Sequence, residues 1–199
     1  MSTVKSKKLQ VGTDATSSNN FTIYQPATPD GTLRIGVGNA DSPTEVGQFN
    51  ANGYKSVATV PAMKVALASN TSISASTQTK LPFSVIDFDN NNTFDTSNNR
   101  WTPGVSGWYL ISGTAWFVGI NDAKQCQVVL YKNGASYLTS GLDRSSGGSS
   151  QIAPTLSAPI YLNSTDYVEL YCYQADSGSV NVYSSSQTTW FTGVLIQQT

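Results

Sequence analysis

The chain has 199 residues, a net charge of −1 and no histidine. Charged residues make up only 12% of it, whereas aromatic residues reach 11%. This composition, rich in Ser, Thr, Asn and Gly, is typical of many short strands joined by polar turns, not of helices. The near-neutral charge gives no electrostatic basis for binding nucleic acid, and no stretch approaches the roughly 20 apolar residues of a membrane span.

Residues 1–14 are predicted to form an extended arm without a core of its own. The arm lacks the apolar run of a secretory signal, and it carries a small basic cluster of Lys5, Lys7 and Lys8. Such a cluster is either a solvated tail or a contact to an anionic surface.

Residues 15–60 are predicted to form a small β segment, with strands over 21–25, 33–37 and 46–49. Turn chemistry separates these strands, for example at Pro29-Asp30-Gly31 and Asn52-Gly53. The strands are too few and too weakly apolar for an independent core, so we expect them to pack on another copy or on a larger partner. The candidate anchoring residues are Lys5, Lys7, Lys8, Phe21, Ile23 and Tyr24.

Residues 61–199 hold a denser series of strands. The predicted strands are 63–68, 80–88, 108–118, 125–132, 136–142, 152–161, 167–174, 180–184 and 189–197. Asn133-Gly134 predicts a hairpin, because a type I′ turn needs positive φ at both central residues. Strands at this spacing, without helical periodicity, indicate an all-β sandwich or jelly roll.

Two of these strands are apolar on both faces. In 108–118, Trp108, Leu110 and Trp116 share one parity, while Tyr109 and Phe117 share the other. In 189–197, Trp190, Val194 and Ile196 share one parity, while Phe191 and Leu195 share the other. One face of a sandwich sheet meets the core, so the second apolar face needs another cover. Oligomerisation is the simplest cover, and shielding of a central strand by loops is the alternative. The candidates for trimer interface or core are Trp108, Tyr109, Trp116, Phe117, Trp190 and Phe191.

The sequence gives little support for catalysis or for a cofactor. Without histidine there is no His-based triad or His-containing metal site. Cys126 and Cys172 fall on the apolar parity of strands and are predicted to be buried thiols, with a disulfide as the alternative. Asp87 and Asp89 lie close enough in sequence to suggest a glycosidase pair, and together with Asp95 they suggest a calcium site. The alternative is a solvated Asx-rich turn, and we expect no enzyme activity.

Several motifs over residues 61–199 resemble C1q/TNF-like domains. They are Arg100-Trp101-Thr102-Pro103 before Gly107-Trp108-Tyr109-Leu110-Ile111, then Val129-Leu130-Tyr131-Lys132-Asn133-Gly134, then Tyr161 to Leu170, and finally Trp190-Phe191-Thr192-Gly193-Val194-Leu195-Ile196. Trp101 stands where that family has Phe, and Ser164-Thr165 replaces its usual Gly. The resemblance implies a jelly-roll sandwich assembled as a homotrimer.

The front of the chain resembles the opening of certain tailed-bacteriophage structural proteins. The resemblance rests on Val11-Gly12-Thr13, Asn19-Asn20-Phe21-Thr22, Gly31-Thr32-Leu33-Arg34-Ile35, and Phe49-Asn50-Ala51-Asn52-Gly53. It implies a protein of the virion surface, made in the bacterial cytoplasm without membrane insertion.

The leading hypothesis is a trimeric capsid decoration (cement or head-fibre) protein. Its N-terminal part would bind the major capsid protein or another virion protein, and its jelly-roll knobs would point outward. The alternative is a tail-fibre tip that binds a host surface glycan or receptor. A sugar-cleaving virion enzyme is a third class, but it lacks an evident acid/base pair.

Overall fold

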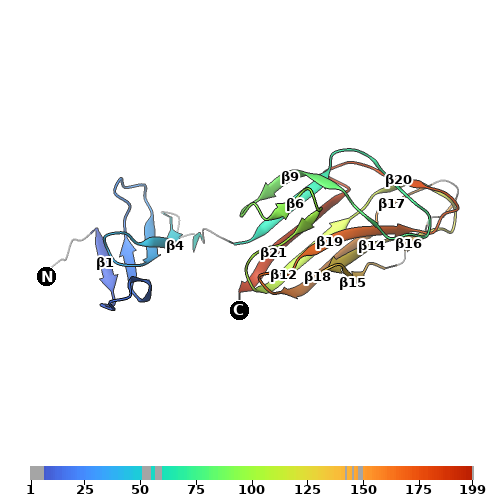
Figure 1. Ribbon diagram of the computed structural model, residues 1–199. Coiled ribbons are helices and arrows are strands. Elements are labelled where there is room, and N and C mark those ends of the chain that lie inside the picture. The colour runs from blue at the N-terminus through green and yellow to red at the C-terminus, as the bar shows by residue number, and fades with distance from the viewer. Residues whose placement is uncertain are drawn as a thin grey trace. The chain divides into compact units, whose positions relative to one another are not determined.

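The computed structural model describes residues 7–50, 55–56, 60–141, 143–144, 146–147 and 150–198. The chain divides into an N-terminal unit, Met1–Thr59, and a C-terminal unit, Val60–Thr199. The described residues contain no α-helix; one 3-10 turn, η1 (Ser17–Asn19), interrupts a chain of β-strands (Figure 1). The prediction of an all-β protein is therefore confirmed.

The N-terminal unit is a single antiparallel sheet. Its strands follow one another in chain order: β1 (Lys8–Val11), β2 (Phe21–Tyr24), β3 (Leu33–Val37), β4 (Thr44–Phe49) and β5 (Lys55–Ser56). The prediction that the chain before residue 15 is an arm is wrong for β1. Leu9 pairs with Ile23 and Val11 with Phe21, so β1 is the edge strand of the sheet. It becomes a strand because β2 supplies its backbone partners, which the local sequence does not reveal.

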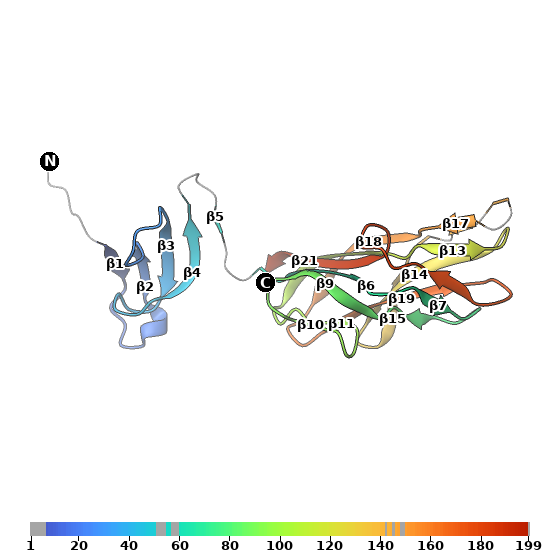
Figure 2. The ribbon, with the colours of Figure 1, turned by 90° about the horizontal axis from the view of Figure 1, so that it is seen from above.

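The C-terminal unit contains three antiparallel sheets (Figure 2). Sheet I has the order β18 (Thr155–Leu162), β12 (Gly107–Thr114), β21 (Trp190–Gln198), β6 (Ala62–Leu67) and β9 (Phe83–Asp89). Sheet II has the order β10 (Phe94–Asp95), β11 (Arg100–Trp101), β19 (Val168–Gln174), β14 (Gln125–Lys132) and β15 (Ala135–Thr139), with β16 (Asp143–Arg144) on β14 and β8 (Thr79–Lys80) on β19. Sheet III has the order β17 (Ser150–Ile152), β13 (Phe117–Ile120), β20 (Val180–Val182) and β7 (Thr71–Ile73).

The predicted strand over 108–118 is two strands in different sheets. β12 ends at Thr114 in sheet I, and β13 begins at Phe117 in sheet III. The hairpin prediction is confirmed, because Asn133 has φ 52° and Gly134 has φ 78°, and the strands on either side pair.

Alternate residues of each sheet fill one aromatic-rich core. Phe83 and Phe191 stack with their ring centroids 6.0 Å apart, and Trp101 meets Tyr109 edge to face at 5.5 Å. The Trp101 indole N–H donates to Thr93, and the Tyr109 hydroxyl donates to the carbonyl of Val105, so both buried polar groups are satisfied. This core fixes which side of sheet I points inward.

Candidate assembly surface

The outward side of sheet I carries a continuous apolar surface. In the register of the sheet, Leu110 lies beside Pro159 on β18 and Val194 on β21, and Val194 lies beside Ala62 on β6. Trp108 pairs with Tyr161 in the next row, and their rings meet at 5.7 Å. We call these residues the assembly face: Ala62, Trp108, Leu110, Pro159, Tyr161 and Val194.

The assembly face is exposed in the single chain even though it is apolar. Trp108 is 45% exposed, Leu110 40% and Val194 39%. Each inward neighbour in β12 is buried, because the strand alternates and the inward residues Tyr109 and Ile111 belong to the core. Single exposed apolar residues are common, but a row that spans four adjacent strands is the pattern of an interaction surface.

Polar side chains border the assembly face on one side. The next row holds Ser112 and Ser157, which hydrogen-bond each other at 2.6 Å, together with Thr192 and Lys64. Lys64 forms an ion pair with Asp87 at 2.7 Å. An apolar centre with a polar rim is the usual layout of a protein–protein interface.

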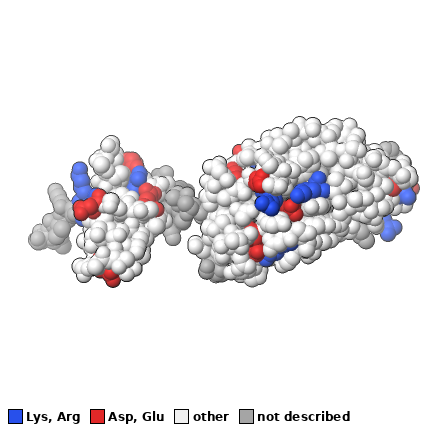
Figure 3. Space-filling view, viewed as in Figure 1, with Lys and Arg blue, Asp and Glu red and all other residues white. Residues whose placement is uncertain are grey.

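Charge is sparse and mixed in sign across the side of the molecule shown in Figure 3. No extended area of one sign is visible in that view. The assembly face itself contains no ionisable side chain except the phenol of Tyr161.

The six residues predicted for interface or core separate into three groups. Tyr109, Phe117 and Phe191 are fully buried in the core of the single chain. Trp116 and Trp190 are half-buried, and Trp116 lies against Tyr183 with ring centroids 5.5 Å apart. Trp108 alone lies on the assembly face. The apolar pattern of the strands indicates two apolar faces, but it does not say which face enters the core.

Ala62, Pro159 and Tyr161 were not predicted to belong to this surface. Val194 was predicted to lie on one apolar side of the strand over 189–197, and it alternates with the buried Phe191 and Gly193 of β21. Pro159 and Tyr161 join the surface only because β18 pairs with β12 along its whole length, from Gly107↔Leu162 to Thr114↔Thr155.

The candidate calcium ligands are used in local contacts. Asp87 pairs with Lys64 at 2.7 Å, whereas Asp89 accepts the backbone N–H of Phe94 at 2.7 Å and that of Asn91 at 3.4 Å. The side-chain amide of Asn98 donates to Asp95 and lowers the pKa of that carboxyl. Among the described residues, no group of three or more His, Cys, Asp or Glu side chains could hold a metal ion.

The two cysteines are free, buried thiols, as predicted. Burial raises the pKa of Cys126 to about 12, and burial also raises the pKa of Cys172. A buried thiol that resists ionisation is a poor nucleophile, so these residues act as small apolar core groups.

The candidate anchoring residues do not form one surface. Phe21 and Ile23 lie on one face of the N-terminal sheet, and Lys8 and Tyr24 lie on the other. Lys7 lines a hollow of about 440 Å³ together with residues of three adjacent strands, among them Leu9, Ile23 and Leu33, and Lys5 lies outside the described residues.

Comparisons with known proteins give partial relatives. No protein-family model matches the chain. It is 29% identical over 99 residues to the uncharacterized protein YqcC of Bacillus subtilis, an alignment that covers 48% of this chain and 27% of YqcC. It is 28% identical over 110 residues to the phage-like element PBSX protein XkdV of the same organism, covering 52% of this chain and 16% of XkdV. The alignments thus span less than a third of either curated relative.

Solved structures establish the fold. The Eiger TNF of S. frugiperda superposes with a TM-score of 0.55 and 12% identity, covering 70% of this chain and 94% of that one. The globular domain of zebrafish complement 1qA gives 0.52 and 21%, covering 70% and 99%. Murine APRIL gives 0.53 and 11%, covering 69% and 99%. The chain has a C1q/TNF-like jelly roll. Among the described residues, no helix is long and apolar enough to cross a membrane.

Proposed function

We propose that the protein is a non-enzymatic structural component of a tailed-bacteriophage particle, and that it works as a homotrimer. The similarity to a protein of a phage-like element supports the phage origin. The jelly-roll fold supports a role in assembly, although a fold alone does not determine function.

One observation carries the trimer proposal: the assembly face is apolar and uncovered in the single chain. Three copies that bury Trp108, Leu110 and Val194 around a common axis remove this surface from water. A closed three-fold ring also leaves no copy of the surface unmatched, so the assembly stops at a defined size.

Within the particle, we propose that the trimer is a capsid decoration (cement or head-fibre) protein. The N-terminal part contacts the major capsid protein or another virion protein, and the jelly rolls face outward on the virion surface. Three linked contacts give avidity, so a trimer strengthens the bridged subunits more than three separate chains would. The short connection between β4, which ends at Phe49, and β6, which starts at Ala62, supports this role because it leaves no room for a fibre shaft.

A tail-fibre tip that binds a host glycan or receptor is the second candidate. Its support is a set of tyrosines on sheet II: Tyr131 and Tyr171 stack with centroids 3.8 Å apart, and Tyr137 is 54% exposed. Aromatic rings with a polar end are suited to recognising carbohydrate or protein surfaces.

Copy number and location on the particle separate the two candidates. Quantitative gels of purified particles and electron microscopy with a labelled chain are the measurements. Hundreds of copies on the capsid would support decoration, while a few dozen or fewer at the tail would reject it in favour of the fibre tip. Degradation of host polysaccharide by the purified chain would contradict the non-enzymatic proposal.

A further inference from the structure

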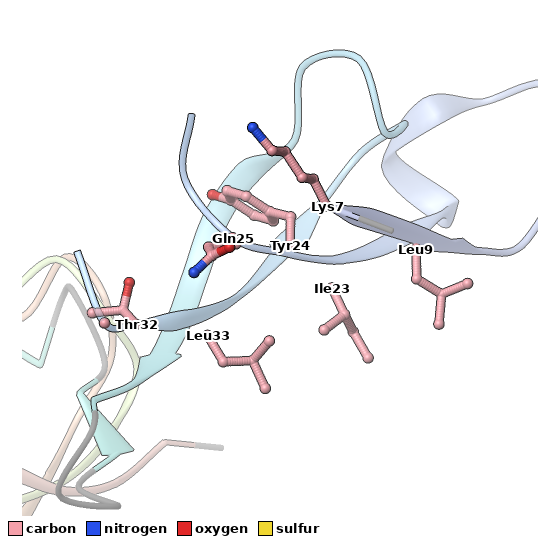
Figure 4. A pocket seen from close by; sticks show the side chains of 8 residues that line it. Lys7, Leu9, Ile23, Tyr24, Gln25, Thr32 and Leu33 are labelled. Carbon is pink, nitrogen blue, oxygen red and sulfur yellow. The ribbon is translucent and has the colours of Figure 1, made fainter. Parts of the chain in front are cut away.

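One face of the N-terminal sheet carries an apolar set across strands β1 to β4. Antiparallel partners project to the same side, so the register assigns one face to an apolar set. This set, the bare face, is Leu9, Val11, Phe21, Ile23, Leu33, Ile35, Val37 and Phe49. Figure 4 shows Leu9, Ile23 and Leu33 projecting to the same side of three adjacent strands.

The bare face is exposed to solvent. Leu9 is 59% exposed, Val11 is 55% exposed, and Phe21 and Leu33 are each 49% exposed. No charged side chain belongs to this set. Its exposed apolar area is roughly 600 Å² per chain, at the upper end of the largest patch found on an ordinary monomer.

The chain's own loop after Val37 packs against part of the opposite face of the same sheet. Lys8 donates to the carbonyl of Ala40 at 2.5 Å, and Gln10 accepts the backbone N–H of Ala40 at 2.9 Å. Thr22, which is fully buried, donates to the carbonyl of Gly38 at 2.9 Å. Gly36 leaves the space that Pro43 occupies, since a Cβ at Gly36 would lie 2.8 Å from the Pro43 ring. The loop of the N-terminal unit thus packs on the polar face of its sheet, while the apolar side chains of the bare face stay exposed to solvent.

We infer that the bare face packs against the bare faces of the other two copies in the trimer. This inference rests on the trimer proposed above. Interfaces between identical copies are the most apolar class, and the eight named residues of the bare face on β1 to β4 include no charged side chain. An area of roughly 600 Å² is below the ~800 Å² per partner of a standard interface, which fits a contact that supplements a second one in the same chain.

The covalent connection makes the second copy the favoured occupant. Residues 50–60 join the bare face to the jelly roll, so a trimer held by its assembly faces brings three N-terminal sheets to an effective concentration of about millimolar. If the partner were a foreign protein, the apolar side chains of the bare face would stay exposed to water until the particle assembled. The other two copies of the chain are present as soon as the trimer forms.

The test uses cysteine substitutions in the full chain. Val11→Cys and Ile23→Cys place a thiol on the bare face, and Gln10→Cys is the matched control on the opposite face of β1. Native Cys126 and Cys172 are buried and give little background. Each variant is first sedimented to establish its oligomeric state, and its rate of maleimide labelling is then measured in the native and the guanidinium-unfolded state.

We expect trimers in which Val11→Cys labels at least about tenfold more slowly than Gln10→Cys, with equal rates after unfolding. A short bis-maleimide should join Val11→Cys or Ile23→Cys copies to one another and not Gln10→Cys copies. Trimers in which all three thiols label equally fast would overturn the inference and leave the proposed trimer standing. Protection without cross-linking, or protection that appears only on the particle, would also overturn it by assigning the face to another occupant. A monomeric wild-type chain would reject the proposed trimer and this inference together.

Discussion

Leu110→Asp should dissociate the trimer while leaving the jelly roll folded. Leu110 lies at the centre of the assembly face, between Pro159 and Val194, and it is 40% exposed in the single chain. Its inward neighbours Tyr109 and Ile111 hold the core and remain unchanged. The substitution therefore changes the surface that we assign to the trimer and not the interior.

The expected magnitude follows from the exposed area. The exposed part of Leu110 is roughly 70 Å², which corresponds to about 1.8 kcal/mol per copy and about 5 kcal/mol per trimer. Removing water from a carboxylate without a partner costs several kcal/mol more per copy. Since about 1.4 kcal/mol changes an equilibrium constant tenfold, the dissociation constant of the trimer should rise by at least about a thousandfold.

Sedimentation equilibrium over a range of concentrations measures this change. Tyr137→Asp is the matched control, because Tyr137 is a large strand residue, 54% exposed, on sheet II. It carries the same loss of β-propensity and should stay trimeric. Circular dichroism should show a folded chain for both variants. A Leu110→Asp chain that sediments as the same trimer as the wild type would refute the assignment of the assembly face.

Two further predictions concern the interior and a turn. Gly193→Ala should destabilise the chain by about 1–3 kcal/mol in guanidinium melts, since its Cβ would overlap the Trp101 ring. Gly178→Ala, with open space around it, should change little, and equal midpoints for the two variants would contradict the packing. The backbone and side-chain N–H groups of Asn121 lower the pKa of Asp176 to about 2, so the stability this carboxylate contributes is full above its unfolded pKa near 4 and is lost as the pH falls towards 2. Asp176→Asn should lower the free energy of unfolding by about 1–3 kcal/mol at pH 7 and should reduce its further fall between pH 4 and 2. If urea melts show the same fall between pH 4 and 2 in the variant and the wild type, Asp176 is not its cause.

Much of the fold could be predicted from local patterns. The strand over 125–132 is found with the predicted bounds, and the Asn133-Gly134 turn has the positive φ angles that its residue types favour. β1 was missed because Lys8 and Gln10 alternate with two apolar residues in a stretch too short to stand out. It becomes a strand through its pairing with β2.

The candidate site was predicted in kind but not in position. Apolar residues on both parities of β12 and β21 indicated a second apolar surface, because side chains alternate along any strand. Metal and catalytic candidates carried less information, since carboxylates such as Asp89 serve equally well in turns.

The sequence by itself determined the all-β class, the turn at Asn133-Gly134, the apolar character of the two cysteines and the presence of two apolar strand faces. These features depend on residue type and on neighbours a few positions away. Only the tertiary structure decided that Tyr109 and Phe191 face the core, that Trp108, Leu110 and Val194 face outward, and that the loop after Val37 packs against part of the polar side of the N-terminal sheet. Those choices depend on which distant strands pair and on which side of each sheet the others pack, and local alternation is the same for both sides.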